Sequence, residues 1–334
     1  MSHKIRWGIL STATIAREAV IPGMRKAPHN DYSEVTAICS RYLAKAESTA
    51  KDLSIPKAYG SYEELIADPD IDAIYNPLPN HMHVPYSIKA LEAGKHVLCE
   101  KPIALSVAEA ETLVDAGRQH PELKLMEAFM YRHHPQWQWA KEVVQSGKIG
   151  ELRTVHSFFS YFDDNPASIH NHPEWGGGGL MDIGCYPISL SRFLFDAEPK
   201  RVVGILEDSP EFKVDDLTSG IMEFAAGTST FTCSTLLTDY QRITAYGTKG
   251  RIEIEIPFNA PPEKPCRAWL EIDDVGREGM SFDICDQYGI QSELFSKAIL
   301  DDTPVPTPIE DAVENMRVIE AIVRSGKNQG WVEL

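Results

Sequence analysis

The 334-residue chain is 43% hydrophobic and carries a formal net charge of −17 at pH 7. Its length predicts two domains, each large enough to have its own hydrophobic core. The negative charge argues against a nucleic-acid partner, because phosphate binding needs a basic face. The six cysteines form no CxxC pair, which indicates neither a disulfide framework nor a zinc ribbon and favours a reducing compartment.

The first residues lead directly into the apolar segment IRWGIL, without the charged and then apolar pattern of a targeting signal. No apolar segment approaches the roughly 20 residues that a membrane span needs. We therefore expect a soluble, cytoplasmic protein with no membrane partner.

Residues 5–125 alternate short apolar segments with amphipathic stretches, which is typical of βαβ units around a parallel sheet. The strand-like segments are IRWGIL, VTAIC, DAIYN, HVLCE and KLMEA. Capping boxes at Ser61–Glu64 and Ser106–Glu109 predict helix starts, and Gly94 and Gly117 predict helix ends. Periodicity by itself fits any α/β domain equally well.

The first predicted strand-to-helix turn spans Gly8–Ala16, where a dinucleotide-binding fold has its phosphate loop. Ser11, Ala13 and Ala16 stand in place of the glycines of a GxGxxG motif. All three side chains are small, so the backbone can still approach a pyrophosphate at the helix N-terminus. As a lone motif, this turn fits an ordinary strand-to-helix connection about as well.

The second predicted strand is followed by Ser40, Arg41 and Lys45. An acidic residue at this place binds the ribose hydroxyls of NAD, whereas an arginine accommodates the 2′-phosphate of NADP. A hydroxyl, a guanidinium and an ammonium suit a phosphate. The segment therefore predicts NADP as the cofactor; the alternative is a solvated helix start with incidental positive charges.

The segment HVLCEKP, residues 96–102, ends an apolar strand in Glu100-Lys101-Pro102. Pro102 favours an extended conformation for the residue before it. We therefore expect Lys101 at the carboxyl end of a parallel strand, where open α/β sheets bind ligands.

The loop at residues 76–83, with two prolines and two histidines, is expected beside the cofactor. It lacks the partner groups of a metal site.

Residues 126–334 predict a second domain of the α+β class. After a helical segment, PQWQWAKEVVQS, come the strand-like segments TVHSFFSYF, KRVVGIL, LTSGIMEF, TSTFTCSTLL, RITAYG and GRIEIEI. Strands that follow one another without intervening helices indicate an antiparallel sheet. The late helical segments SELFSKAILDD and EDAVENMRVIEAIVRSG are expected to pack on this sheet or against the first domain.

Four glycines at residues 176–179 precede a predicted helix that begins near Leu180. On that helix, Asp182 and Tyr186 are four residues apart and share one face. Because consecutive glycines cost conformational entropy, we expect them to allow the backbone a close approach to a ligand or to the other domain. The alternative is a flexible loop before a core helix, although an unpaired buried Asp182 would be costly.

These motifs together resemble the glucose-fructose oxidoreductase/inositol dehydrogenase family, commonly called Gfo/Idh/MocA. The similar segments are GILSTATIA, SRYLAKA, PLPNHMH, HVLCEKP, EAFMYRHHP, GGGGLMDIGCY and VIEAIVRSGKNQGWVEL. The resemblance implies an NAD(P)-binding Rossmann domain over residues 1–125. It also implies a domain with an open, mainly antiparallel sheet over residues 126–334, and a homodimer formed through that sheet.

The resemblance also implies residue roles. We expect Tyr186 to be the acid/base, Lys101 to lower its pKa, and Asp182 to orient the substrate hydroxyl or the lysine. The expected cofactor contacts are Ser11, Thr12, Ala13, Ile15, Ser40, Arg41, Lys45, Pro79, Asn80, His83, Glu100, Lys101 and Arg132. Tyr161, Asn171 and Trp175 are the expected substrate contacts.

A tyrosine at position 186, where the family often has histidine, resembles the branch of glucose-fructose oxidoreductase, NADP-dependent D-xylose dehydrogenases and dihydrodiol dehydrogenases. We predict an NADP-dependent oxidoreductase that acts on an aldose or related cyclic polyol, with D-xylose-like oxidation as the first candidate. The alternatives are trans-dihydrodiol oxidation and reduction of a dicarbonyl such as 1,5-anhydrofructose, for which a histidine at 186 is expected.

Two other classes of protein are disfavoured. A catalytically silent NADP-binding sensor need not retain Lys101, Asp182 and Tyr186 together. A metal-dependent hydrolase built on His170 and His172 with nearby aspartates lacks an established ligand spacing, so no metal is expected.

Overall fold

The computed structural model describes residues 4–334, which divide into two compact units. Unit 1 contains the chain up to Met130 together with Asp286–Val313, and unit 2 contains Tyr131–Cys285 and Glu314–Leu334. The chain therefore returns to unit 1 late in its course. The sequence pattern, by contrast, suggests a single division near residue 125.

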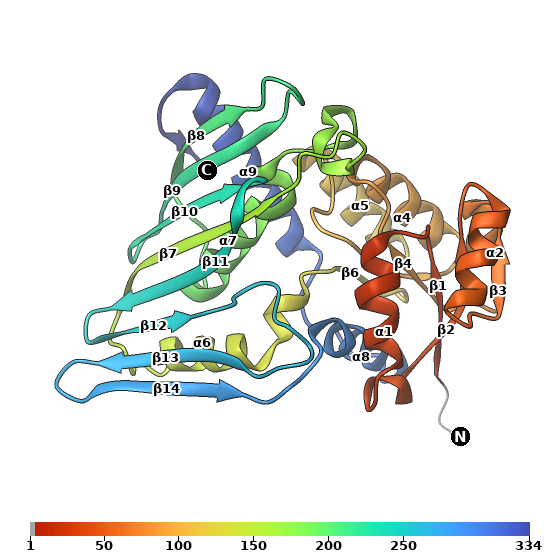
Figure 1. Ribbon diagram of the computed structural model, residues 1–334, viewed down its shortest axis with the longest axis horizontal. Helices are drawn as coiled ribbons and strands as arrows, with labels where there is room; N and C mark the ends of the chain where they lie inside the picture. The colour runs from red at the N-terminus through yellow and green to blue at the C-terminus, as the bar shows by residue number, and fades with distance from the viewer. Residues whose placement is uncertain (1–3) are drawn as a thin grey trace. The chain divides into compact units, whose positions relative to one another are not determined.

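Unit 1 contains a six-stranded sheet with the order β3-β2-β1-β4-β5-β6, in which all neighbours are parallel (Figure 1). Its strands are β1 (Ile5–Ile9), β2 (Ser33–Cys39), β3 (Lys57–Tyr59), β4 (Ala73–Asn76), β5 (His96–Cys99) and β6 (Leu125–Glu127). This arrangement confirms the predicted parallel sheet. The three-residue β3 is too short to produce a recognisable apolar pattern.

The helices of unit 1 connect these strands. They are η1 (Ala16–Val20), α1 (Ile21–Arg25), η2 (His29–Asp31), α2 (Leu43–Asp52), α3 (Tyr62–Ile66), η3 (Asn80–Met82), α4 (His83–Glu92), α5 (Val107–Gln119) and α8 (Gln287–Leu300). Both predicted helix starts are confirmed, since Ser61 and Ser106 each accept a 3.2 Å hydrogen bond from the backbone N–H three residues later. The glutamate half of each predicted box differs, because Glu64 and Glu109 accept from the N–H groups of Gly60 and Leu105, one residue before the serine.

Of the two predicted helix ends, Gly94 follows α4 with a φ of +75°, as expected of a terminating glycine. The prediction at Gly117 is wrong, because α5 continues to Gln119. Close packing explains why a glycine stands at position 117, because a Cβ atom there would lie 3.2 Å from Cδ2 of Leu125.

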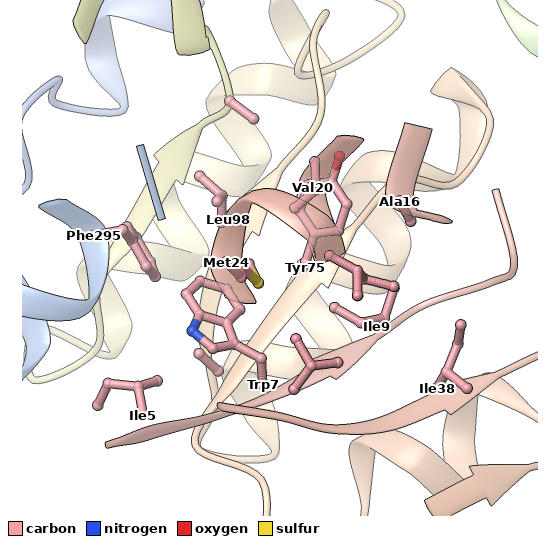
Figure 2. Packing of buried hydrophobic residues seen from close by; sticks show 14 of the residues in the cluster. Ile5, Trp7, Ile9, Ala16, Val20, Met24, Ile38, Tyr75, Leu98 and Phe295 are labelled. Atoms are coloured by element: carbon pink, nitrogen blue, oxygen red, sulfur yellow. The ribbon is translucent and has the colours of Figure 1, made fainter. Parts of the chain in front are cut away.

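The core of unit 1 includes a contribution from α8. Figure 2 shows Trp7, Tyr75 and Phe295 in this core, and the rings of Trp7 and Phe295 are 5.6 Å apart. The Trp7 indole N–H donates a 3.2 Å hydrogen bond to Ser296 Oγ. Helix α8 therefore completes a core that begins with the first strand of the chain.

Unit 2 contains a nine-stranded sheet with the order β14-β13-β12-β11-β7-β10-β9-β8-β15 (Figure 1). Its neighbours are antiparallel except for the parallel pair β7 and β10. The strands are β7 (Leu152–Phe162), β8 (Arg201–Asp208), β9 (Asp215–Glu223), β10 (Thr228–Ser234), β11 (Leu236–Gly247), β12 (Gly250–Ile254), β13 (Cys266–Ile272), β14 (Gly276–Phe282) and β15 (Val332–Glu333). The predicted mainly antiparallel sheet is confirmed, and β13 to β15 extend it beyond the predicted strands.

The remaining helices are η4 (Met130–His133), α6 (Pro135–Gln145), η5 (Ile169–Asn171), η6 (Pro173–Trp175), η7 (Leu180–Gly184), α7 (Cys185–Phe195) and α9 (Glu310–Asn328). Glycines allow two of them to approach the sheet closely. A Cβ atom at Gly184 would lie 2.9 Å from Cys233 Sγ, and one at Gly204 would lie 2.7 Å from a side-chain carbon of Ile322. Within residues 4–334, no helix is both long and apolar enough to cross a bilayer.

Candidate active site

Lys101 follows the carboxyl end of β5, as predicted. The neighbouring Glu100 is fixed by the Tyr75 hydroxyl, which donates a 2.7 Å hydrogen bond to Oε1. The Lys101 N–H lies 3.3 Å from the other carboxylate oxygen, Oε2. Glu127, at the end of β6, accepts a 2.8 Å hydrogen bond from Ile103 N–H. The backbone on both sides of Lys101 is therefore held by two carboxylates, that of the half-buried Glu100 and that of the buried Glu127.

The loop after β4 is connected to the Lys101 turn through His83. This imidazole is buried, with Nδ1 at 2.7 Å from Pro102 O and Nε2 at 2.6 Å from Leu78 O. A neutral imidazole donates from only one nitrogen, and burial lowers the pKa of His83 to about 4. Both ring nitrogens face carbonyl oxygens, so the side chain positions the two loops instead of pointing a nitrogen at a cofactor.

The first turn has the backbone shape of a phosphate loop although it lacks the usual glycines. Ser11 has a φ of +72°, the left-handed conformation that glycine adopts without strain. Its Oγ accepts a 3.2 Å hydrogen bond from Ala13 N–H, and a helical segment begins directly afterwards. Ser11, Thr12, Ala13 and Ile15 thus fit the approach of a pyrophosphate to a helix N-terminus.

Arg41 and Lys45 are exposed just beyond the carboxyl end of β2. Neither forms an ion pair within residues 4–334. Ser40 is buried, and its Oγ lies 3.3 Å from Tyr42 N–H. Because β1, β2, β4 and β5 are parallel, the turns that follow them, with Ser11, Arg41, Asn80 and Lys101, lie along one edge of the sheet.

In unit 2, Asp182 is buried in η7, and its carboxylate contacts Tyr161 and His170. Tyr161, at the end of β7, donates a 2.5 Å hydrogen bond to Oδ2. The Nδ1 atom of His170, in η5, lies 3.4 Å from Oδ1. Tyr161 was expected to contact substrate, and in the structure its hydroxyl holds the proposed catalytic carboxylate.

Tyr186 lies one turn later, in α7, and is 5% exposed. Its ring centroid is 5.7 Å from those of Tyr131 and Phe159 and 5.3 Å from that of Phe258. These aromatic contacts restrict the orientation of the ring. The helix that carries Asp182 begins as a π-helix, not as the regular α-helix that the four-residue spacing suggests.

The glycine run packs tightly against unit 2 itself. A Cβ atom at Gly177 would lie 2.4 Å from His170 O, and one at Gly178, whose φ is +115°, would lie 2.3 Å from Asp215 Oδ1. Asp215 accepts 2.7 Å hydrogen bonds from Leu180 N–H and from the Thr218 hydroxyl. The glycine run therefore lets the Asp215 carboxylate and the turn at His170 approach the start of the helix that carries Asp182.

Three other predicted residues are engaged within unit 2. Arg132 donates a 2.7 Å hydrogen bond to Ser189 Oγ, and Asn171 donates to the carbonyls of residues 163 and 165. Both side chains are buried. The Trp175 ring stacks on His172 at 4.0 Å. The side chains of Arg132 and Asn171 are therefore hydrogen-bonded within unit 2, which indicates a structural role for both.

Comparison with known sequences shows which protein family the chain belongs to. The profile of an oxidoreductase family with an NAD-binding Rossmann fold matches residues 5–129, and that of the GFO/IDH/MocA C-terminal domain matches residues 137–253. The chain belongs to the GFO/IDH/MocA family. The protein is thus an NAD(P)-dependent oxidoreductase, as the motifs predict.

Relatives in the GFO/IDH/MocA family act on different substrates. The chain is 38% identical to D-xylose 1-dehydrogenase (NADP(+)) 2 of Haloferax volcanii, over 98% of this chain and 99% of that protein. It is 33% identical to trans-1,2-dihydrobenzene-1,2-diol dehydrogenase of Bos taurus, over 78% and 76%. A 3-ketoreductase from Actinomadura kijaniata, solved with NADP and TDP-benzene, has a TM-score of 0.90 and 28% identity, covering 97% of this chain and 98% of that one.

Two residues of this GFO/IDH/MocA site escape prediction from sequence, namely His170 as a partner of Asp182 and Asp215 at the start of its helix. Burial raises the pKa of Asp215 to about 6. The only local signal for Asp215 is an acidic pair immediately before an apolar strand. Within residues 4–334, no group of three or more His, Cys, Asp or Glu side chains is arranged to hold a metal ion.

Proposed function

We propose that the protein is an NADP-dependent oxidoreductase that transfers a hydride between nicotinamide and an aldose or related cyclic polyol, with D-xylose-like oxidation as the first candidate. The observation that carries the proposal is the presence of Lys101, Asp182 and Tyr186 in a chain 38% identical, over 98% of its length, to an NADP-dependent D-xylose dehydrogenase. These residues provide an ammonium, a carboxylate and a phenol.

Oxidation of a CH–OH group removes a hydride and a proton, and bound NADP⁺ supplies the hydride acceptor. Tyr186 takes the hydroxyl proton in this proposal. A phenol has an ordinary pKa near 10, so it serves as a base only if a nearby positive charge favours its ionised form. Lys101 supplies that charge, and Asp182 orients the substrate hydroxyl.

The preference for NADP rests on the end of β2. Arg41 and Lys45 are exposed there, and no carboxylate stands in the segment Cys39–Lys45 to bind a bare ribose diol. Ser40, Arg41 and Lys45 would hold the 2′-phosphate, and Ser11 to Ile15 would hold the pyrophosphate. Pro79, Asn80, Glu100 and Lys101 would lie nearer the nicotinamide. Calorimetry with NADPH and NADH tests this assignment, and tighter binding of NADH contradicts it.

A second candidate is oxidation of a trans-dihydrodiol. It is favoured by the 33% identity to a dihydrodiol dehydrogenase and by two aromatic side chains, Tyr161 beside Asp182 and Trp175 stacked on His172. Aromatic rings stack on the apolar face of a sugar and on a cyclic diol alike. Reduction of a sugar-derived dicarbonyl such as 1,5-anhydrofructose is the corresponding candidate for the opposite direction.

A substrate panel separates these functions. Aldoses, polyols and trans-diols are assayed with NADP⁺, and ketosugars and dicarbonyls with NADPH, by the absorbance of NADPH. We expect the highest kcat/KM with a pentose such as D-xylose. If NADPH binds but no compound of the panel is turned over, the proposed substrate class is wrong.

We propose further that the protein is a homodimer formed through the open face of the large sheet. On that face Ile205 of β8 is 69% exposed and Ile221 of β9 is 39% exposed. Their strands pair so that Ile205 and Ile221 lie on the same side, opposite the buried Val202 and Met222. Sedimentation should give a dimer for the native chain and a monomer for Ile205→Glu combined with Ile221→Glu; a monomeric native chain contradicts this assembly.

A further inference from the structure

Asp182 lies between two side chains from different loops of unit 2. Its Oδ2 atom accepts the Tyr161 hydroxyl, and its Oδ1 atom faces His170 Nδ1 at 3.4 Å. The carboxylate is 8% exposed, whereas the imidazole is 32% exposed. A buried carboxylate is stabilised only by polar partners, so this contact also fixes how the half-buried imidazole is oriented.

The carboxylate favours the tautomer of His170 that carries its proton on Nδ1, the nitrogen 3.4 Å from Asp182 Oδ1. An ionised carboxylate only accepts hydrogen bonds, so the neutral imidazole keeps its proton on Nδ1, facing Asp182. The other nitrogen, Nε2, makes no hydrogen bond within residues 4–334. With its proton on Nδ1, His170 presents an acceptor lone pair on Nε2.

The backbone holds this pair together. Gly178 N–H donates a 2.9 Å hydrogen bond to His170 O. A Cβ atom at Gly177 would lie 2.4 Å from the same oxygen, so only glycine permits this approach. The η5 turn that carries His170 is thus fixed against the start of the helix that carries Asp182.

We propose that His170 is a further substrate-contacting residue, whose Nε2 accepts a hydrogen bond from a second substrate hydroxyl next to the one that Tyr186 deprotonates. Asp182 and Tyr186 stand on successive turns of one continuous helix, so the group that Asp182 orients is a neighbour of Tyr186. The inference rests on the proposed function, because it requires an alcohol substrate. It specifies vicinal diols, including sugars, as substrates in preference to isolated alcohols.

Two substitutions separate this role from a merely structural one. In His170→Asn the side-chain amide can still donate to Asp182 from near the position of Nδ1, but the acceptor at the position of Nε2 is lost. His170→Ala loses both contacts. The matched control is His172→Asn, because His172 belongs to the same loop and its ring nitrogens face Glu174 and Pro166 within that loop.

The full-length enzyme is assayed with D-xylose and 2-deoxy-D-xylose, which differ only in the hydroxyl next to the anomeric carbon. We expect both His170 variants to lower kcat/KM for D-xylose by about 10- to 100-fold, as for one hydrogen bond with charge-assisted character. They should leave the 2-deoxy sugar nearly unchanged. Normal discrimination in His170→Asn, with a loss only in His170→Ala, overturns the proposal and leaves His170 a structural partner of Asp182.

A second measurement does not depend on turnover. Nitrogen-15 NMR of labelled histidine in the NADPH-bound enzyme should show His170 as the Nδ1–H tautomer, and Asp182→Asn should remove that bias. D-xylose should then shift the Nε2 resonance more than the 2-deoxy sugar does. If no alcohol is oxidised, the proposed function fails, while an unshifted Nε2 at saturating sugar overturns the role of His170 separately.

Discussion

The two halves of the proposed catalytic machinery are built in different ways. Lys101 stands in a contiguous motif at a strand end. The residues that fix its turn, Tyr75, Glu100 and Glu127, lie on or directly after adjacent parallel strands. Asp182 instead depends on Tyr161, His170 and Asp215, which come from separate strands and loops. A short motif therefore identifies the first half, whereas the second half can be recognised only when the chain is folded.

The largest expected effect on turnover comes from removing one reacting group from each half, Lys101 from the first and Tyr186 from the second. Lys101→Ala and Tyr186→Phe should each lower kcat by about 10²- to 10⁴-fold, the range for loss of acid–base assistance. NADPH affinity, measured by calorimetry, should change little. Near-normal turnover in both variants would show that neither group belongs to the chemistry.

Gly178→Ala should damage the second half through the backbone. Its φ of +115° disfavours any side chain, and the new Cβ would meet Asp215 Oδ1, so we expect a loss of about 2–4 kcal/mol of unfolding free energy. Gly147→Ala is the control, because its φ of +71° is strained but no atom lies within 4 Å of the Cβ. Denaturant unfolding should show a smaller loss of unfolding free energy for Gly147→Ala than for Gly178→Ala. Equal losses would contradict a steric clash between the new Cβ and Asp215.

Arg41→Ala tests a residue of the first unit that the local motif predicts. It is exposed and forms no ion pair within the described chain, so the substitution should leave thermal stability unchanged. NADPH affinity should fall about tenfold, as for the loss of one charge-assisted contact, and NADH affinity should not. An equal loss of affinity for NADPH and NADH would mean that Arg41 does not bind the 2′-phosphate.

The smallest effect concerns the pH dependence of stability at Asp215. Burial raises its pKa in the folded protein to about 6, against an ordinary value near 3.9 in the unfolded chain. Between these values the folded state binds more protons, so stability from this residue falls as the pH rises from about 4 to 6. Asp215→Asn should flatten the slope of unfolding free energy against pH in that window, and an unchanged slope would contradict the assignment.

Prediction from sequence worked where the determinants are local. The alternation of apolar segments predicted the parallel sheet, and the hydroxyl and glutamate of two capping boxes predicted helix starts that the structure confirms. Gly117 was misassigned because a glycine signals a helix end and a close helix packing site in the same way. Its packing partner, Leu125, is visible only in three dimensions.

The sequence by itself determined the family, the two sheet classes, and the position of Lys101 at a strand end, because these follow from short-range periodicity and contiguous motifs. Only the tertiary structure decided that α8 completes the core of the first unit, that the glycine run closes on His170 and Asp215, and that Tyr161 pairs with Asp182. Such contacts join residues far apart in the chain, and no local pattern records which partner will meet a buried carboxylate.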